Sequence, residues 1–137
     1  MLANRAIDSQ RLSEIDLCCF PCGCNSQQYF KQTRDPILIT KDANGVIIGY
    51  LHLRVSKGST PKSLWIHTLA VHPNHRRQNI GTQLIVDAES YAKRHGYKCL
   101  YLSVLEDNLP ARTLYEKSGF IYPDEMNKTC MKKHINS

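Results

Sequence analysis

The chain has no apolar run that approaches the roughly 18–20 consecutive residues needed to cross a bilayer. Residues 1–16 also lack the unbroken apolar stretch of a secretory signal peptide. These two absences argue against a membrane-spanning or exported protein. We therefore expect a cytoplasmic protein without a membrane partner.

Acidic residues are in deficit, with 12 Asp and Glu against 18 Lys and Arg, so the formal net charge is +6. Such a balance suits an anionic partner, which can be nucleic acid, a membrane surface or a phosphorylated cofactor. The sequence lacks basic and aromatic residues interleaved on one strand pair, and it lacks a recognised DNA-binding helix motif. We therefore expect no nucleic-acid partner, although charge alone does not identify the anion.

The cysteines lack the arrangement that is typical of a structural zinc site. Four of the six crowd into residues 18–24, with no second ligand pair and no nearby histidine, whereas zinc ligands usually come in two separated pairs. Disulfides are not the default in a protein without an export signal. We expect free thiols and no metal. The cysteines are Cys18, Cys19, Cys22, Cys24, Cys99 and Cys130.

With 137 residues, the chain has room for one domain, residues 1–137, with one core. Period-two and period-3.6 apolar patterns alternate along it, punctuated by turn signals such as Asp42–Gly45. The order of elements predicts an α+β fold. The expected helices are Ser9–Cys19, Asn25–Gln32, Gly81–His95 and Pro110–Ser118, and the expected strands are Ile37–Lys41, Val46–Val55, Leu64–His72, Lys98–Leu105, Phe120–Tyr122 and Lys128–Ile135.

A basic loop, Pro73–Thr82, connects the third expected strand to the clearest helix. The first turn of a helix carries unpaired N–H groups and the positive end of the helix dipole, so it attracts phosphate. Gly81 lets the backbone approach closely, and Asn79 is the residue type that, after glycine, best tolerates the left-handed conformation. The loop is neither a Walker loop nor a Gly-x-Gly-x-x-Gly fingerprint. From this chemistry alone, a phosphate site and a plain basic turn remain equally good readings.

Two blocks of sequence resemble the GNAT superfamily of N-acetyltransferases. Residues 76–81 are similar to its acetyl-CoA motif, Gln/Arg-x-x-Gly-x-Gly/Ala, with Arg76 first, Gly81 last and Asn79 in place of the middle glycine. Residues 108–120 resemble the family stretch Asn-x-x-Ala-x-x-Leu-Tyr-Glu-x-x-Gly-Phe. The resemblance covers residues 37–135. The family's usual first strand is not evident in Met1–Asp8, and whether it is absent is left open.

This resemblance implies a mixed, mostly antiparallel sheet flanked by helices, with a short helical segment at the N-terminus. It also implies acetyl-CoA as co-substrate, an amine acceptor as the other partner, and a monomer or homodimer. By the same resemblance, the residues that contact acetyl-CoA are Leu69, Val71, Arg76, Arg77, Gln78, Asn79, Ile80, Gly81, Thr82 and Asn108.

The resemblance places Tyr115 beside the sulfur of CoA, where a tyrosine with a pKa near 10 can protonate the leaving thiolate. The alternative is that Tyr115 is only a core aromatic residue of its helix.

The base is expected to be His67. Trp65 stands where many relatives carry a glutamate, and His67, two residues on, lies on the same face of the strand and has a suitable pKa. Residues 65–72 also resemble the His-x-His-x-Leu-Ala-Val-His stretch of arylalkylamine N-acetyltransferases, with the second histidine kept. A histidine that merely packs within the sheet is the alternative. Glu106 and Asp107 are further candidates, since Ser103 stands where other relatives have a glutamate.

The sequence thus predicts an N-acetyltransferase that transfers the acetyl group of acetyl-CoA to a primary amine of a small molecule or protein, by direct attack in a ternary complex. Trp65 and Ser103, at positions where relatives carry a base, support a second reading: a catalytically weak regulatory module that binds acyl-CoA.

Overall fold

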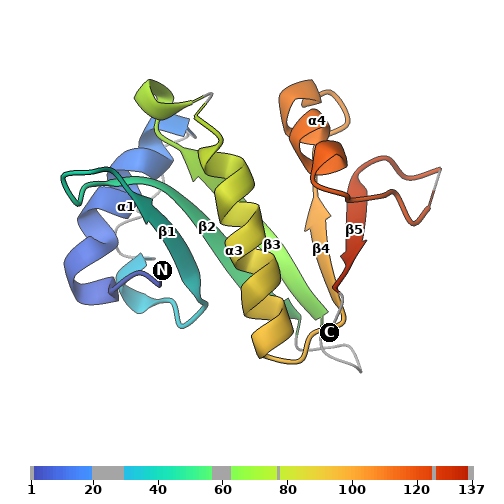
Figure 1. The fold of residues 1–137 in the computed structure, drawn as a ribbon, viewed down its shortest axis with the longest axis horizontal. Coiled ribbons are helices and arrows are strands. Elements are labelled where there is room, and N and C mark those ends of the chain that lie inside the picture. Colours follow the sequence, from blue (N-terminus) through green and yellow to red (C-terminus); the bar gives the residue numbers. More distant parts are fainter. Residues whose placement is uncertain (1, 20–29, 57–62, 77, 125, 136–137) are drawn as a thin grey trace.

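The computed structural model describes residues 2–19, 30–56, 63–76, 78–124 and 126–135 (Figure 1). Residues 30–32 are helical. The other elements, in chain order, are α1 (Arg5–Cys19), β1 (Ile37–Lys41), β2 (Ile47–Ser56), β3 (Ser63–Val71), the 3-10 turn η1 (Pro73–His75), α3 (Ile80–Arg94), β4 (Cys99–Ser103), α4 (Leu109–Lys117) and β5 (Cys130–His134).

The five strands form one sheet in the order β1-β2-β3-β4-β5. Every neighbouring pair is antiparallel except β3 and β4, which are parallel and are joined through α3. The β1–β2 connection is the expected turn: the Asp42 carboxylate accepts hydrogen bonds from the N–H groups of Asn44 and Val46, and Gly45 has a φ of 80°. The expectation of a mixed, mostly antiparallel sheet flanked by helices is confirmed.

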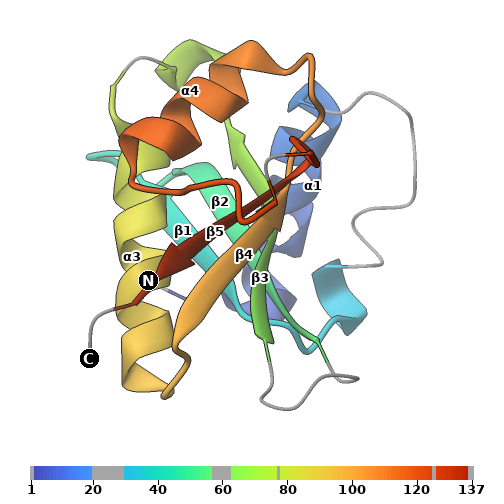
Figure 2. The same cartoon turned by 90° about the vertical axis from the view of Figure 1, so that its right-hand side faces the viewer.

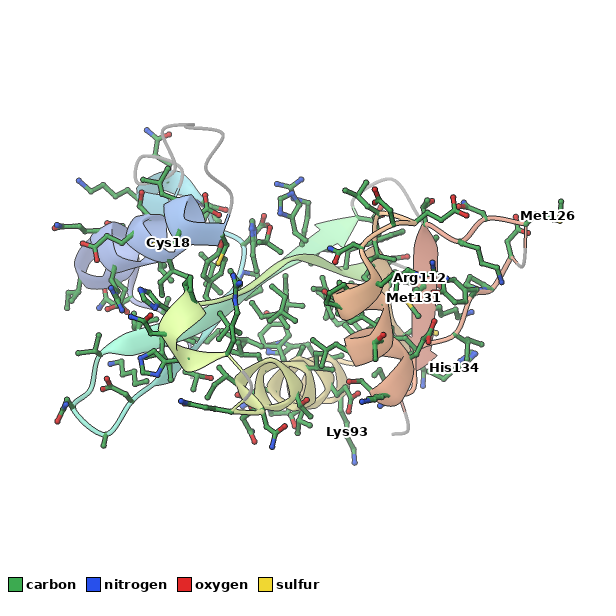
Figure 3. All side chains as sticks on the ribbon, turned by 90° about the horizontal axis from the view of Figure 1, so that it is seen from above. Cys18, Lys93, Arg112, Met126, Met131 and His134 are labelled. Atoms are coloured by element: carbon green, nitrogen blue, oxygen red, sulfur yellow. The ribbon has the colours of Figure 1, made fainter. Side chains whose placement is uncertain are left out.

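Helices cover the sheet from both sides, α1 on one face and α3 on the other (Figure 3). The α3 side holds the larger core, in which Leu84 and Ala88 pack with Leu53 and Leu100, all fully buried. On the α1 side, Leu12 and Ile15 pack against β1 and β2. Each face buries its own apolar residues, because successive side chains of a strand point to opposite sides.

The start of the chain differs from the expected boundaries. Helix α1 begins at Arg5 rather than Ser9, because Asn4 acts as a cap: its side-chain oxygen accepts a hydrogen bond from the N–H of Ile7 at 3.3 Å. Of the family's usual first strand, the described residues keep one isolated antiparallel bridge, from Leu2 to Leu38. Most of the expected helix Asn25–Gln32 lies outside the described residues.

The expected strand Phe120–Tyr122 is wrong. Only Ile121 pairs, in an isolated bridge to Lys132, because Gly119 reverses the chain with a φ of 96° just before it. The remaining expected helices and strands lie within two residues of their predicted ends. This includes the strand Lys128–Ile135, of which Cys130–His134 is paired in the ladder with β4.

None of the described helices combines the length and the apolarity that crossing a bilayer requires. The four described cysteines, Cys18, Cys19, Cys99 and Cys130, are free thiols. Within the described ranges, no three His, Cys, Asp or Glu side chains gather as metal ligands would. Cys22 and Cys24 fall outside those ranges, so the cluster at residues 18–24 is not tested as a whole.

Candidate active site

The strands β3 and β4 separate at one end of the sheet. Their parallel pairing runs from Leu64↔Leu100 to Ile66↔Leu102 and then stops, while β3 continues to Val71. Figure 2 shows α4 lying across this end, toward which both strands run. A gap lined by strand backbone therefore opens beneath α4.

The backbone groups of Leu69 and Val71 face that gap. The N–H of His72 donates to the Ile48 carbonyl at 2.8 Å, which marks one hydrogen-bonded position of the antiparallel β2–β3 ladder. Because such positions alternate, the backbone groups of Leu69 and Val71 point away from β2. On that side the ladder with β4 has already ended at Ile66. Their N–H groups are thus placed to donate to a ligand in the gap.

A β-bulge in β3 presents His67. His52 pairs with Thr68 and Leu53 pairs with Ile66, so His67 is the extra residue without a partner on β2. Bulges re-aim side chains and are common beside active sites. The His67 ring lies 4.8 Å from the ring of buried His52, and its Nδ1 is 2.9 Å from the Thr68 hydroxyl. The bulge fixes the direction of the His67 imidazole.

A pocket of ≈ 450 Å³, here called the cleft pocket, fills the gap between the separated strands. It brings together residues of α1, β3, β4, α4 and the loop before α4. His67 and Tyr115, the two expected catalytic residues, both border it. Its lining residues are Asp16, His67, Thr68, Leu69, Ser103, Val104, Leu105, Asn108, Ala111 and Tyr115.

Tyr115 reaches the cleft pocket from the buried side of α4. Its side chain is 8% exposed and packs edge-on against Phe120, with ring centroids 5.8 Å apart. Burial raises the pKa of the Tyr115 hydroxyl to about 12, because the phenolate would lose solvation. The hydroxyl therefore keeps its proton at neutral pH and can act as a donor. Tyr115 is thus a core aromatic residue that also borders a pocket.

His67 is exposed and remains largely neutral at pH 7. Partial burial lowers the pKa of its imidazole, and the neighbouring His52 and Arg54 lower it further. His52 is itself held by Asp35, whose Oδ2 lies 3.0 Å from the His52 Nε2. Burial lowers the pKa of His52 in spite of that carboxylate. A neutral imidazole at the edge of the cleft pocket can accept a proton.

The other candidate bases are less well placed. Glu106 and Asp107 are exposed and do not line the cleft pocket. Ser103 lines it, but a hydroxyl is a poor base. Trp65 stacks on Tyr101, with ring centroids 5.1 Å apart. Among the candidates named from the sequence, His67 alone combines a suitable pKa with contact to the pocket.

Asn79 adopts the left-handed conformation that its residue type favours. With φ 61° and ψ 21°, it is the one non-glycine residue in the described ranges with a positive φ. It is also the N-terminal cap of α3, and its side chain makes no capping hydrogen bond. No acceptor among the described residues is recorded for the N–H groups of Ile80, Gly81 and Thr82. The first turn of α3 is therefore open to an anion.

A second pocket, here called the loop pocket, lies over that first turn and has a volume of ≈ 460 Å³. Three cationic or titratable side chains border it, and none of its lining residues is acidic. Like the cleft pocket, it lies between the end of β3 and α4. It is lined by Val71, His75, Arg76, Asn79, Ile80, Gly81, Thr82, Pro110, Thr113, Leu114 and Lys117.

Arg76 is exposed and folds back over the end of β3. Its Nε donates to the Val71 carbonyl at 3.4 Å, and its guanidinium lies 3.5 Å from the Cys19 sulfur. Gln78 is exposed but does not line the loop pocket. Arg77 lies outside the described residues.

Gly81 also has a role in helix packing that was not expected from the sequence. It lies within the first turn of α3, and its φ is not positive, unlike those of Gly45, Gly96 and Gly119. A Cβ at this position would meet the Leu114 Cδ2 at 3.2 Å. The missing side chain therefore lets α4 pack closely on the start of α3, which brings the two walls of the loop pocket together.

Asn108 caps α4 and borders the cleft pocket. Its side-chain oxygen accepts a hydrogen bond from the Ala111 N–H at 3.4 Å. The expected contact with acetyl-CoA and the capping role are both compatible with this position.

Sequence reasoning missed three residues of the site. Lys117 brings a positive charge to the loop pocket from the end of α4, although it stands at a variable position of the 108–120 block. His52 lies behind His67, and Asp16 lines the cleft pocket while accepting a hydrogen bond from Tyr50 at 2.6 Å. A signal existed only for His52, a polar residue inside an otherwise apolar strand.

Known acetyltransferases resemble this chain in sequence. A family model described as "Acetyltransferase (GNAT) family" matches residues 9–120. The uncharacterised N-acetyltransferase YhfO of Bacillus subtilis is 31% identical over 91 residues, which are 65% of this chain and 61% of that protein. The chain spans at most half the length of the next two curated relatives.

Solved structures share the fold over the whole chain. A putative acetyltransferase of Salmonella typhimurium, yncA, solved with acetyl-CoA, matches with a TM-score of 0.78 at 17% identity, covering 100% of this chain and 93% of that one. The ribosomal-protein-S18-alanine N-acetyltransferase of Escherichia coli matches with a TM-score of 0.79 at 18% identity, covering 100% and 94%. At these identities the likeness concerns the fold.

Proposed function

Because the chain belongs to the GNAT family of acetyltransferases, we propose that it transfers the acetyl group of acetyl-CoA to a primary amine. The observation that carries the proposal is the presence of two pockets between the end of β3 and α4. One adjoins the open first turn of α3, and the other is bordered by Tyr115 and His67.

The pyrophosphate of acetyl-CoA fits the loop pocket. The N–H groups of Ile80, Gly81 and Thr82 and the dipole of the fifteen-residue helix α3 favour a bound anion. Arg76 and Lys117 add positive charge at its border. The thioester end then reaches into the cleft pocket, where the N–H group of Leu69 is available to polarise the carbonyl, while the N–H group of Val71, at the loop pocket, can hold the pantetheine.

The reaction exchanges one bond and moves three protons. His67 accepts a proton from the acceptor ammonium, and the neutral amine attacks the thioester carbonyl. The carbon–sulfur bond breaks as the carbon–nitrogen bond forms, and the Tyr115 hydroxyl protonates the departing thiolate. The acylated nitrogen then loses its extra proton to the tyrosinate, and His67 releases its proton to solvent. The products are CoA, an acetylated amine and a proton.

The surrounding groups support these roles. Asp35 hydrogen-bonds to His52, and the bulge places the His67 ring against the His52 ring. These contacts orient His67, the proposed base. The four free thiols of the described residues fit a reducing compartment, and we keep the cytoplasm as the proposed location.

The test is an assay of free CoA release with acetyl-CoA and a panel of small amines and peptides. The proposal predicts amine-dependent release by the wild-type protein and a large loss in Tyr115→Phe, which keeps the ring packed against Phe120. If acetyl-CoA binds but no amine accelerates release, the chain is instead a regulatory module that binds acyl-CoA.

A further inference from the structure

No helix among the described residues covers one face of the β3–β4–β5 half of the sheet, here called the open face. On β4, Leu100 and Leu102 are buried in the core beside α3, whereas Tyr101 is partly exposed and Ser103 is exposed. On β5, Met131 is buried in that core and its neighbour Lys132 is not. Figures 1 and 3 show why: α1 lies over the β1–β2 side of the sheet, away from β4 and β5.

Four side chains form a row across this open face. The strand register places Arg54 opposite Trp65, Trp65 opposite Tyr101, and Tyr101 opposite Lys132. The Trp65 and Tyr101 rings stack with an interplanar angle of 26°, and the Lys132 ammonium lies 5.7 Å from the centre of the Tyr101 ring. We call these four residues the aromatic row. It presents the edges of two stacked aromatic rings between two cations.

The two cations of the aromatic row, Arg54 and Lys132, differ in whether they already have an acidic partner. Arg54 is already engaged, since its Nε lies 3.5 Å from the Asp35 carboxylate. No carboxylate partner is recorded for Lys132 within the described part of the chain, and its recorded contact is with the Tyr101 ring. The row itself contains no acidic residue. An acidic group on a ligand would therefore find an available ammonium at the β5 end.

The aromatic row lies directly beside the cleft pocket. Trp65 and Tyr101 each stand two residues before a residue that lines that pocket, His67 and Ser103. Two residues along a strand correspond to about 7 Å, the length of a short arylalkyl chain. An amine at His67 and Tyr115 can thus extend a flat ring over the row while its nitrogen remains at the reacting centre.

We propose that the aromatic row binds the body of the acceptor, and that the acceptor is an aromatic amine that carries an acidic group. This inference rests on the proposed function and names its substrate class. The edges of the Trp65 and Tyr101 rings contact the face of the acceptor ring, and Lys132 pairs with the acid. The same residues disfavour polycationic amines, because a second ammonium group would meet Lys132 or Arg54.

The experiment compares kcat/KM for four small amines of matched size: phenethylamine, para-carboxyphenethylamine, para-aminomethylphenethylamine and cyclohexylethylamine. We expect the carboxylate to be preferred over phenethylamine by about five- to tenfold, in line with one partly exposed charged contact. We expect cyclohexylethylamine to be poorer than phenethylamine, and the second ammonium to be the worst substrate. Equal values for all four amines overturn the inference.

Variants of Lys132 and Trp65 then test which residues cause these substrate preferences. Lys132→Gln should abolish the carboxylate preference, measured as the ratio of kcat/KM for para-carboxyphenethylamine to kcat/KM for phenethylamine. Lys128→Gln is the matched control, because that ammonium lies 4.7 Å from the Tyr122 ring, outside the aromatic row. Trp65→Leu should reduce the aromatic preference, with rescue by Trp65→Phe. A carboxylate preference that survives Lys132→Gln contradicts the assignment, as does a stronger preference for peptides than for any small amine.

Affinity for acetyl-CoA is also measured on every variant, so that a failure of the proposed function can be told from a failure of the aromatic row. If no amine of any class is acetylated, the proposed function fails. If amines are acetylated without discrimination, only the aromatic row fails. Thermal unfolding of each variant shows whether a change in kcat/KM reflects a damaged fold.

Discussion

The left-handed Asn79 allows a sharp test of the loop, because its role can be separated from every side-chain contact. The residue is exposed, its side chain makes no capping hydrogen bond, and its φ is 61°. Replacing it with alanine removes no packing and no bond. Alanine tolerates this conformation less well than asparagine does, so Asn79→Ala should lose about 1 kcal/mol of unfolding free energy.

Asn79→Gly is the counterpart. Glycine adopts the left-handed conformation freely, but it also gives the unfolded chain more freedom, so the two effects offset and stability should stay near that of the wild type. The alanine variant should melt about 3–5 °C below the glycine variant. Gln78→Ala, an exposed neighbour without a positive φ, is the control.

Ligand affinity provides the second readout of the same pair. If acetyl-CoA binds only when residue 79 is left-handed, and the free loop of Asn79→Ala relaxes from that conformation, the cost of about 1 kcal/mol appears as an affinity about fivefold lower instead of as lost stability. Asn79→Gly should bind as the wild type does. Isothermal titration and thermal unfolding measure both quantities. Equal stability and equal affinity of the alanine and glycine variants would refute the reasoning.

Three further predictions concern the cleft pocket and its support. Tyr115→Phe should lower kcat about 10²- to 10⁴-fold in steady-state assays while calorimetry finds acetyl-CoA affinity retained; an unchanged kcat would remove Tyr115 as the acid. Since the pKa of His67 is lowered, kcat/KM should rise with pH through a value below 6.5 and then level off, and this limb should vanish in His67→Gln. Gly81→Val should lose about 1–3 kcal/mol in denaturant titrations through its clash with Leu114, and Leu114→Ala should restore part of it; additive losses in the double variant would contradict the contact.

The sequence was most informative where local chemistry decides the structure. The turn at Asp42–Gly45 and the cap at Asn108 follow from residue types that bond to their own backbone. The left-handed Asn79 was also anticipated, because few residue types other than glycine suit that conformation. Such features depend on neighbours in the chain and can be recognised without knowing the fold.

Features that depend on contacts between distant segments were not predictable. The reason for Gly81 is a contact with Leu114, which belongs to another helix. The bulge that presents His67 depends on a register shift against β2, which a period of two does not reveal. Likewise, the buried His52 becomes meaningful only once Asp35 and His67 are seen on either side of it.

Chain reversals limited the prediction of element ends. Phe120–Tyr122 has the apolar and aromatic composition of a strand, but the left-handed Gly119 leaves room for a single bridge at Ile121. The start of α1 was missed because Asn4 caps the helix before its apolar pattern begins.

The most direct test of the central claim is the stoichiometry of the reaction. CoA released and acetylated amine formed are quantified together, by thiol titration and mass spectrometry, after acetyl-CoA and an amine are mixed with the protein. The two pockets predict one acetylated amine for each CoA released, with both lost in Tyr115→Phe. Release of CoA without an acetylated amine, or tight binding of acetyl-CoA without release, would contradict the account.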